Sequence, residues 1–133
     1  LMLVDTSGLL CYHHRDERQH PEAVRLFHTA PFLLTHSYVL AEFVALCHTR
    51  GLDRTKVLAF ASELIENEAV EIVWVDEYLH RAALALLQMR PDKTYSLSDA
   101  VSFVLMRIRR INEALTTDRH FEQEGFVRLL TPG

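Results

Sequence analysis

The sequence predicts an α/β fold in three α/β/α layers, with a five-stranded parallel sheet covered by helices on both faces. Two observations lead to this prediction. Short apolar runs alternate with helical segments along the whole chain, as in strand–helix–strand units. The runs lack polar alternation, which indicates strands buried on both faces. The chain of 133 residues, 49% of them hydrophobic, is long enough to form one core. We therefore expect a single domain over residues 1–133.

Each strand is expected where an apolar run ends at a polar turn. The first run, LMLVD, leads into the turn signal Thr6-Ser7-Gly8. The third run, VEIVWV, is β-branched and aromatic, which favours a strand. The predicted strands cover residues 1–5, 32–36, 70–75, 113–117 and 126–130.

The predicted helices begin and end at residues typical of helix termini. Pro21 suits a first turn, Gly51 suits a helix end, and Asp76 is a good N-cap. Either Ser96 or Ser98 could cap the last long helix. The predicted helices cover residues 20–30, 37–50, 53–67, 76–90 and 96–110.

Four carboxylates are expected at one edge of this sheet. In open parallel sheets, functional sites form at the carboxyl ends of the strands. Asp5 ends the first predicted strand and Asp118 ends the fourth. The helix after the second strand starts at the same edge, which places Glu42 ~7–8 Å below it at 1.5 Å per residue. Asp99 lies in the first turn of the helix that leads into the fourth strand, so it is also expected at this edge.

Each of the three aspartates also has a purely structural explanation. Asp5 could cap the helix that follows it, and Asp118 could cap the short segment 118–124. Asp99 fits a capping box with Ser96. These alternatives stay open when each residue is considered alone.

Glu42 is harder to explain as a structural residue. It is the only charged residue between Ser37 and Cys47. One helical turn away its neighbours are apolar or aromatic, so the glutamate lies either at the margin of the core or opposite a cation. These neighbours are Tyr38, Val39, Ala45 and Leu46.

The combination of acids points to a divalent cation. Carboxylates are the ligands that suit hard cations such as Mg²⁺ and Mn²⁺. Without a cation, carboxylates crowded into one pocket raise each other's pKa by repulsion. Bound divalent ions remove that repulsion, and they can polarise a phosphodiester and activate a water molecule.

Four segments, LMLVDTSGLL, LAEF, LSDAVSFVLM and ALTTDRHFEQEGF, resemble the successive motifs of the PIN-domain ribonuclease family, especially its small VapC-like toxins. They occur in the family's order over nearly the whole chain. The resemblance implies strand order 3-2-1-4-5 and a Mg²⁺- or Mn²⁺-dependent endoribonuclease that cleaves single-stranded or loop RNA. The expected products carry 5′-phosphate and 3′-hydroxyl ends. The catalytic and metal-binding residues it implies are Asp5, Glu42, Asp99 and Asp118.

The resemblance also implies supporting residues and partners. Thr6 or Ser7, together with Thr116, match the small polar residues that accompany the acids. The expected partners are the RNA substrate, a small antitoxin of a type II toxin–antitoxin pair whose tail occupies the acidic groove, and a second copy in a homodimer. Many members carry a further acid where this chain has His120, which predicts a weakly held second metal.

Other functions remain open. A PIN-like module that binds proteins without catalysis would keep the same fold, and a different metal-dependent phosphohydrolase could act on DNA. The segment D-T-S-G could also indicate three other kinds of site, but each requires one residue that this chain lacks. An aspartic protease needs Gly directly after Thr6, an aspartyl phosphatase needs Asp in place of Ser7, and an integrin-type metal site needs Ser in place of Leu9.

The net charge of −4, with His counted as neutral, gives no global basic field that would attract nucleic acid. Contacts to phosphates are therefore expected from basic residues in loops near the sheet edge, although ordinary solvated charges explain these residues equally well. The candidates are Arg15, Arg18, Arg90, Lys93 and Arg119.

Cysteine, histidine and hydropathy patterns indicate the environment of the protein. Cys11 and Cys47 lie in apolar runs without metal-ligand spacing, so we expect buried thiols in a reducing compartment. His13, His14 and His20 lack a zinc spacing and are expected on a solvated loop. No apolar stretch in the sequence approaches the ~18–20 residues of a membrane span. We therefore expect a cytoplasmic protein without membrane contact.

Overall fold

The computed structural model describes residues 1–131 and contains a five-stranded parallel sheet. The strand order β3-β2-β1-β4-β5 confirms the predicted order. Each strand is shorter than predicted, because residues at the ends of the apolar runs form caps and loops. The strands are β1 (Met2–Val4), β2 (Leu33–His36), β3 (Val70–Val73), β4 (Glu113–Leu115) and β5 (Val127–Arg128). Residues 132 and 133 of the predicted domain lie outside the described residues.

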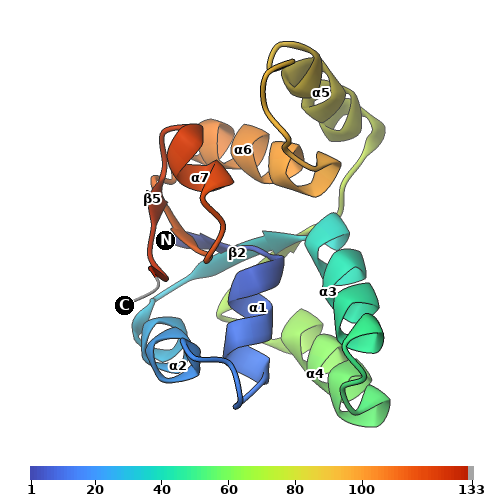
Figure 1. Cartoon of the computed structure of the whole chain (residues 1–133), viewed down its shortest axis with the longest axis vertical. Helices are drawn as coiled ribbons and strands as arrows, with labels where there is room; N and C mark the ends of the chain where they lie inside the picture. The colour runs from blue at the N-terminus through green and yellow to red at the C-terminus, as the bar shows by residue number, and fades with distance from the viewer. Residues whose placement is uncertain (132–133) are drawn as a thin grey trace.

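Helices cover both faces of the sheet, which confirms the three-layer prediction (Figure 1). One face carries α1 (Thr6–His13), α2 (His20–Thr29), α3 (Ser37–Thr49) and α4 (Arg54–Glu66). The other carries α6 (Leu97–Arg109) and α7 (His120–Gln123), with α5 (Glu77–Gln88) packed on the outer side of α6. Ser96 rather than Ser98 caps α6. Among the described residues, no helix is long and apolar enough to cross a membrane.

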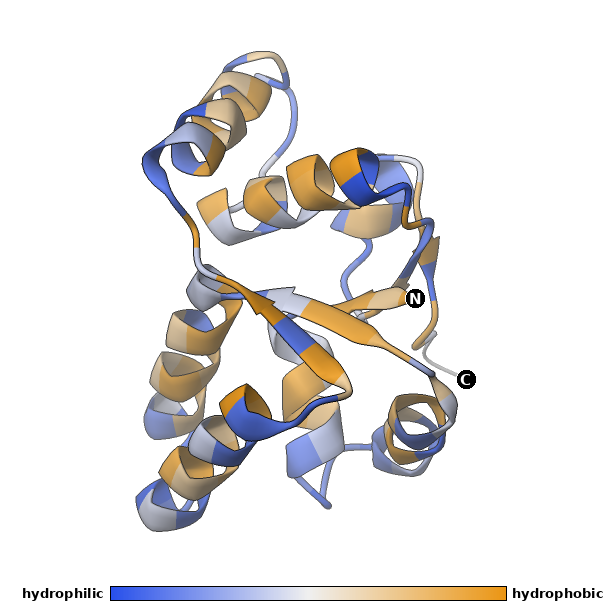
Figure 2. Cartoon of the chain, turned by 180° about the vertical axis from the view of Figure 1, so that it is seen from behind, coloured by the Kyte–Doolittle hydropathy of each residue, from blue (hydrophilic) through white to orange (hydrophobic). Residues whose placement is uncertain are grey.

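Alternating strand residues divide the core between the two faces of the sheet. Met2 and Val4 pack against the layer that contains α1 to α4. Leu3 and Leu34 point to the other face, where Phe103 of α6 belongs to the same cluster. Figure 2 shows the apolar strands between the two helical layers. Because the strands are parallel, their carboxyl ends lie together at one edge.

A glycine lets α1 approach the sheet closely. A Cβ atom on Gly8 would lie 2.0 Å from the carbonyl oxygen of Leu115 in β4. No side chain fits at that distance, so the glycine is needed for this packing. The close approach brings Asp5, at the start of α1, beside the chain that follows β4.

The expectation that His13, His14 and His20 lie on a solvated loop is wrong for His13 and His20. His20 begins α2, and its Nδ1 lies 2.8 Å from the Cys11 carbonyl oxygen. His13 is the last residue of α1, and its ring centroid lies 4.9 Å from that of Phe60 and 5.9 Å from that of Phe43. Burial lowers the pKa of His13. The helix was difficult to delimit from sequence because TSGLLCYH lacks a polar stripe.

Candidate active site

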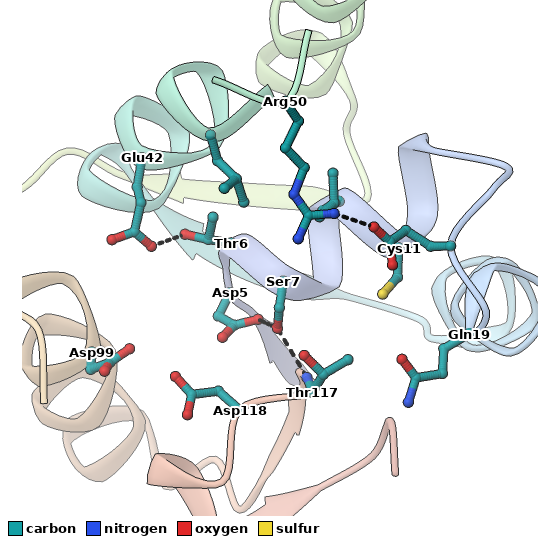
Figure 3. Close-up of a pocket in the computed structure, with 13 residues that line it drawn as sticks. Asp5, Thr6, Ser7, Cys11, Gln19, Glu42, Arg50, Asp99, Thr117 and Asp118 are labelled. Carbon is teal, nitrogen blue, oxygen red and sulfur yellow. Dashed lines mark hydrogen bonds and ion pairs between the residues drawn. The ribbon is translucent and has the colours of Figure 1, made fainter. Parts of the chain in front are cut away.

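A cleft of about 270 Å³ opens at the carboxyl edge of the sheet. All four predicted carboxylates line it, together with Thr6 and Ser7 (Figure 3). They come from the end of β1, from α3, from the first turn of α6 and from the loop after β4. The full lining is Asp5, Thr6, Ser7, Leu10, Cys11, Glu17, Gln19, Glu42, Leu46, Arg50, Asp99, Thr117 and Asp118.

Asp5 both caps α1 and lines the cleft. Its Oδ1 accepts hydrogen bonds from the Gly8 amide at 2.9 Å and the Ser7 hydroxyl at 2.8 Å. Its Oδ2 accepts one from the Thr116 hydroxyl at 2.7 Å. Burial raises the pKa of Asp5 to about 7 although these hydrogen bonds oppose the shift, and nearby Asp99 raises it further. Asp5 is therefore both the N-cap of α1 and a residue of the candidate site.

Asp99 likewise combines a cap with a place in the cleft. The Ser96 hydroxyl accepts a hydrogen bond from the Asp99 amide at 3.0 Å, and Asp99 Oδ2 accepts one from the Ser96 amide at 3.1 Å. This is the predicted capping box. Burial raises the pKa of Asp99, and the neighbouring charge of Asp118 adds to the effect. Helix N-termini also favour negative charge, so capped helix starts are suitable positions for clustered acids.

Asp118 and Asp99 are joined by His120. Asp118 Oδ1 accepts a hydrogen bond from the His120 amide at 2.9 Å. The His120 Nδ1 atom lies 3.1 Å from Asp99 Oδ2 and 3.3 Å from Asp118 Oδ1. One ligand atom from each of the three residues lies within 4.8 Å of the other two.

Asp99, Asp118 and His120 form a group of side chains that could hold a metal ion. The 3.1 Å separation of His120 Nδ1 from Asp99 Oδ2 is that of a hydrogen bond. The other ring nitrogen, Nε2, lies 3.1 Å from the Thr94 hydroxyl. Metal-binding histidines commonly make such an outer hydrogen bond. Sequence analysis left His120 without a role, although its position two residues after Asp118 is a signal that could have found it.

Glu42 faces the cleft rather than the core. It is exposed, and its Oε1 accepts a hydrogen bond from the Thr6 hydroxyl. Figure 3 shows its carboxylate on the wall of the cleft above Asp5 and Asp99. This exposure does not fit the alternative in which Glu42 lies at the margin of the core.

Ser7 and Thr116 tie the two central strand ends together. The Ser7 hydroxyl accepts a hydrogen bond from the Thr117 amide at 2.9 Å. The Thr116 hydroxyl accepts one from the Asp118 amide at 2.9 Å. Because both hydroxyls also contact Asp5, they fix Asp5 relative to Asp118.

The basic residues predicted to contact phosphates differ in their positions and partners in the structure. Arg119 is exposed and does not belong to the described lining of the cleft. Arg90 forms two hydrogen bonds, at 3.0 and 3.1 Å, with the buried Glu124 carboxylate, so it has a structural role. Arg50, which sequence analysis did not select, lines the cleft and pairs with Glu17. No local signal links these two residues, because they are 33 positions apart.

Fold and site together define an α/β/α protein with a carboxylate-lined cleft at the carboxyl edge of its parallel sheet. The PIN domain model matches residues 2–126, and the chain belongs to this family, as the resemblance of its motifs predicted.

Relatives with known functions match over nearly the full chain. The chain is 32% identical over 130 residues to the 23S rRNA-specific endonuclease VapC20 of Mycobacterium tuberculosis, in the strains CDC 1551 / Oshkosh and ATCC 25618 / H37Rv. These alignments cover 97% of this chain and 98% of the relative. The crystal structure of Mycobacterium tuberculosis VapC20, described as a sarcin-ricin loop cleaving toxin, matches with a TM-score of 0.88 at 29% identity. This match covers 99% of this chain and 100% of that one.

Proposed function

We propose that the protein is a metal-dependent endoribonuclease of the VapC toxin type. The observation that carries the proposal is the convergence of Asp5, Glu42, Asp99 and Asp118 on one cleft in a PIN-domain chain. The similarity to VapC20, an rRNA endonuclease, supports RNA as the substrate. Single-stranded or loop RNA suits a cleft of about 270 Å³ better than duplex RNA does, because a flexible phosphodiester enters it more readily.

The residues present fit a divalent cation. Burial raises the pKa values of two of the acids, Asp5 and Asp99, and neighbouring carboxylates add to the shift, so a bound cation would lower the cost of ionising them. Oxygen ligands suit Mg²⁺ and Mn²⁺, and the imidazole of His120 adds a nitrogen that Mg²⁺ favours less. We infer that Asp5, Glu42, Asp99 and Asp118 hold the ion and that His120 adds a nitrogen ligand.

The roles of the protein groups follow from their contacts. Bound Mg²⁺ or Mn²⁺ supplies polarisation of the phosphodiester and activation of a water molecule. Ser7 and Thr116 hold the Asp5 carboxylate in a fixed orientation through Oδ1 and Oδ2. Thr6 anchors Glu42 by its Oε1 atom, so that Oε2 can serve the cation or accept a proton from the attacking water. Preorganised groups of this kind lower the barrier because they need no rearrangement during the reaction.

The test of this function is cleavage of a structured RNA in millimolar Mn²⁺, with a DNA of matched sequence alongside. The variant is Asp99→Asn, and the matched control is Asp16→Asn, whose side chain is 89% exposed. Wild type and Asp16→Asn should cleave RNA loops but not DNA, and Asp99→Asn should lose cleavage. Equal cleavage by Asp99→Asn would contradict the proposal. Selective cleavage of DNA would favour a DNA phosphohydrolase, and a folded but inactive wild type would favour a protein-binding module.

Metal binding gives an independent measurement. Calorimetric titration with Mn²⁺ should show binding to wild type and to Asp16→Asn. Asp99→Asn and His120→Ala should each bind at least about tenfold more weakly, because even residues that only support the metal ligands typically contribute 10–100-fold to metal affinity. Unchanged affinity in both variants would show that the cluster does not hold the ion.

The proposal extends to partners. We propose a homodimer and a small antitoxin that blocks the cleft, acting in the cytoplasm where the RNA substrate occurs. Large apolar side chains at the surface, including Trp74 at 61% and Tyr78 at 74% exposure, support a protein interface. Sedimentation at increasing protein concentration would measure the dimer, and a monomer at all concentrations would contradict it.

A further inference from the structure

We propose that Arg50 binds a backbone phosphate of the RNA strand in the cleft, and that Glu17 restrains and partly neutralises Arg50 until the RNA enters. This inference rests on the proposed function, because it concerns how the same cleft receives its substrate. It assigns roles to two residues outside the acidic motifs.

The charge of the cleft wall creates the need for such a residue. Five carboxylates line the cleft, whereas Arg50 is the one lysine or arginine in its described lining. A polyanion meets a repulsive surface there, and cations bound by the acids offset this repulsion at one end only. Within the described lining, a direct ion pair with a phosphate would therefore involve Arg50. The five carboxylates belong to Asp5, Glu17, Glu42, Asp99 and Asp118.

The position of Arg50 suits a contact with a neighbouring phosphate. It is the C-cap residue of α3, and its side chain extends from that helix toward the cleft, on the opposite wall from Asp99 and Asp118 (Figure 3). A strand that crosses the cleft can thus place one phosphate at the acids and another at Arg50.

The ion pair with Glu17 leaves the guanidinium available for a second partner. Arg50 Nη1 donates to Glu17 Oε1 at 2.6 Å, and the side chains are 49% and 24% exposed, respectively. A guanidinium has five N–H donors, and its planar fork matches phosphate geometry. Glu17 therefore holds the side chain in one orientation while other donors remain for a phosphate.

This arrangement predicts that substitutions of Arg50 and of Glu17 change RNA affinity in opposite directions. Arg50→Ala removes the phosphate contact and leaves Glu17 as an uncompensated negative charge. Glu17→Gln removes a negative charge from the wall and frees Arg50 from its competitor. If the pair served only to stabilise the fold, both substitutions would break it and would act in the same direction. Because Arg50 is half exposed, the pair contributes little to stability, so both variants should remain folded.

The experiment measures RNA binding by fluorescence anisotropy in an Asp99→Asn parent, which prevents cleavage, in millimolar Mn²⁺. The probe is a fluorescein-labelled single-stranded RNA. Arg50→Ala should weaken binding by roughly tenfold and lower the slope of log K against log salt by about 0.7. Glu17→Gln should tighten binding by roughly threefold, and Arg50→Lys should lie between wild type and Arg50→Ala because it keeps the charge but loses the fork.

The outcomes separate this inference from the proposed function. Equal binding by all variants, or shifts of the same sign in Arg50→Ala and Glu17→Gln, would overturn the role of Arg50 while RNA cleavage by wild type still stood. If Arg50→Ala and Glu17→Gln shift RNA binding in opposite directions but wild type does not cleave RNA, the role of Arg50 is supported and the proposed nuclease activity is contradicted. An absence of RNA binding by the parent would overturn the inference directly. Thermal melting of each variant checks that the fold is retained.

Discussion

Asp5→Asn should stabilise the metal-free protein at high pH, although the substitution removes a residue of the proposed active site. Asp5 is buried, and its pKa is raised from 3.8 to about 7. A carboxyl group with a raised native pKa favours the protonated form, so its ionisation above pH 7 costs stability. Asparagine has nearly the same shape and carries no charge. The gain should therefore be largest above pH 7 and disappear as the pH falls from 7 toward 3.8.

The magnitude follows from the shift in pKa. A difference of about 3 units, at 1.36 kcal/mol per unit, gives an upper bound of roughly 4 kcal/mol. Part of this gain is lost because Oδ2, which accepts from the Thr116 hydroxyl, becomes an N–H donor. Allowing about 1–2 kcal/mol for that hydrogen bond, we expect a net increase of about 2 kcal/mol in the free energy of unfolding at pH 8.

Urea denaturation of wild type, Asp5→Asn and the exposed control Asp16→Asn, in EDTA at pH 8 and pH 5, measures this effect. Adding Mn²⁺ should reverse the order at pH 8. Wild type gains about 2.7 kcal/mol when the ion is at a hundredfold excess over Kd, whereas Asp5→Asn binds the ion poorly. A lower stability of metal-free Asp5→Asn at pH 8, or a gain equal at both pH values, would refute the reasoning that burial of a charge dominates at this position.

Two further substitutions test the packing and the chemistry of the site. Gly8→Ala should lower the free energy of unfolding by about 3 kcal/mol, since its Cβ would lie 2.0 Å from the Leu115 carbonyl oxygen and overpacking of this kind costs about 1–3 kcal/mol or more. Urea denaturation measures this change, and an unchanged midpoint would show that α1 can shift freely. Glu42→Gln should change stability by less than about 0.5 kcal/mol because Glu42 is exposed. It should lower Mn²⁺-dependent RNA cleavage by at least about tenfold, and full activity in a folded Glu42→Gln protein would remove Glu42 from the mechanism.

Local sequence determined the order of the elements and the edge at which the acids lie. Each strand or helix is specified by signals that lie within a few residues in the sequence, such as an apolar run or a helix cap. The parallel arrangement of the strands then places Asp5 and Asp118 at one edge of the sheet. The capping box of Ser96 and Asp99 could also be predicted, because it spans only three residues. Local patterns were weaker where a helix had no polar stripe, as in α1.

Only the tertiary structure decided which side chains meet. Thr116 contacts Asp5 across 111 positions, and Gly8 permits the approach of α1 to β4. The contact of His120 with Asp99, 21 positions away, and the pairing of Arg50 with Glu17, 33 positions away, depend on how α6, α3 and the connecting loops pack. Such contacts are set by helix placement and strand register over the whole fold, whereas propensity and periodicity describe only the neighbourhood of each residue in the chain.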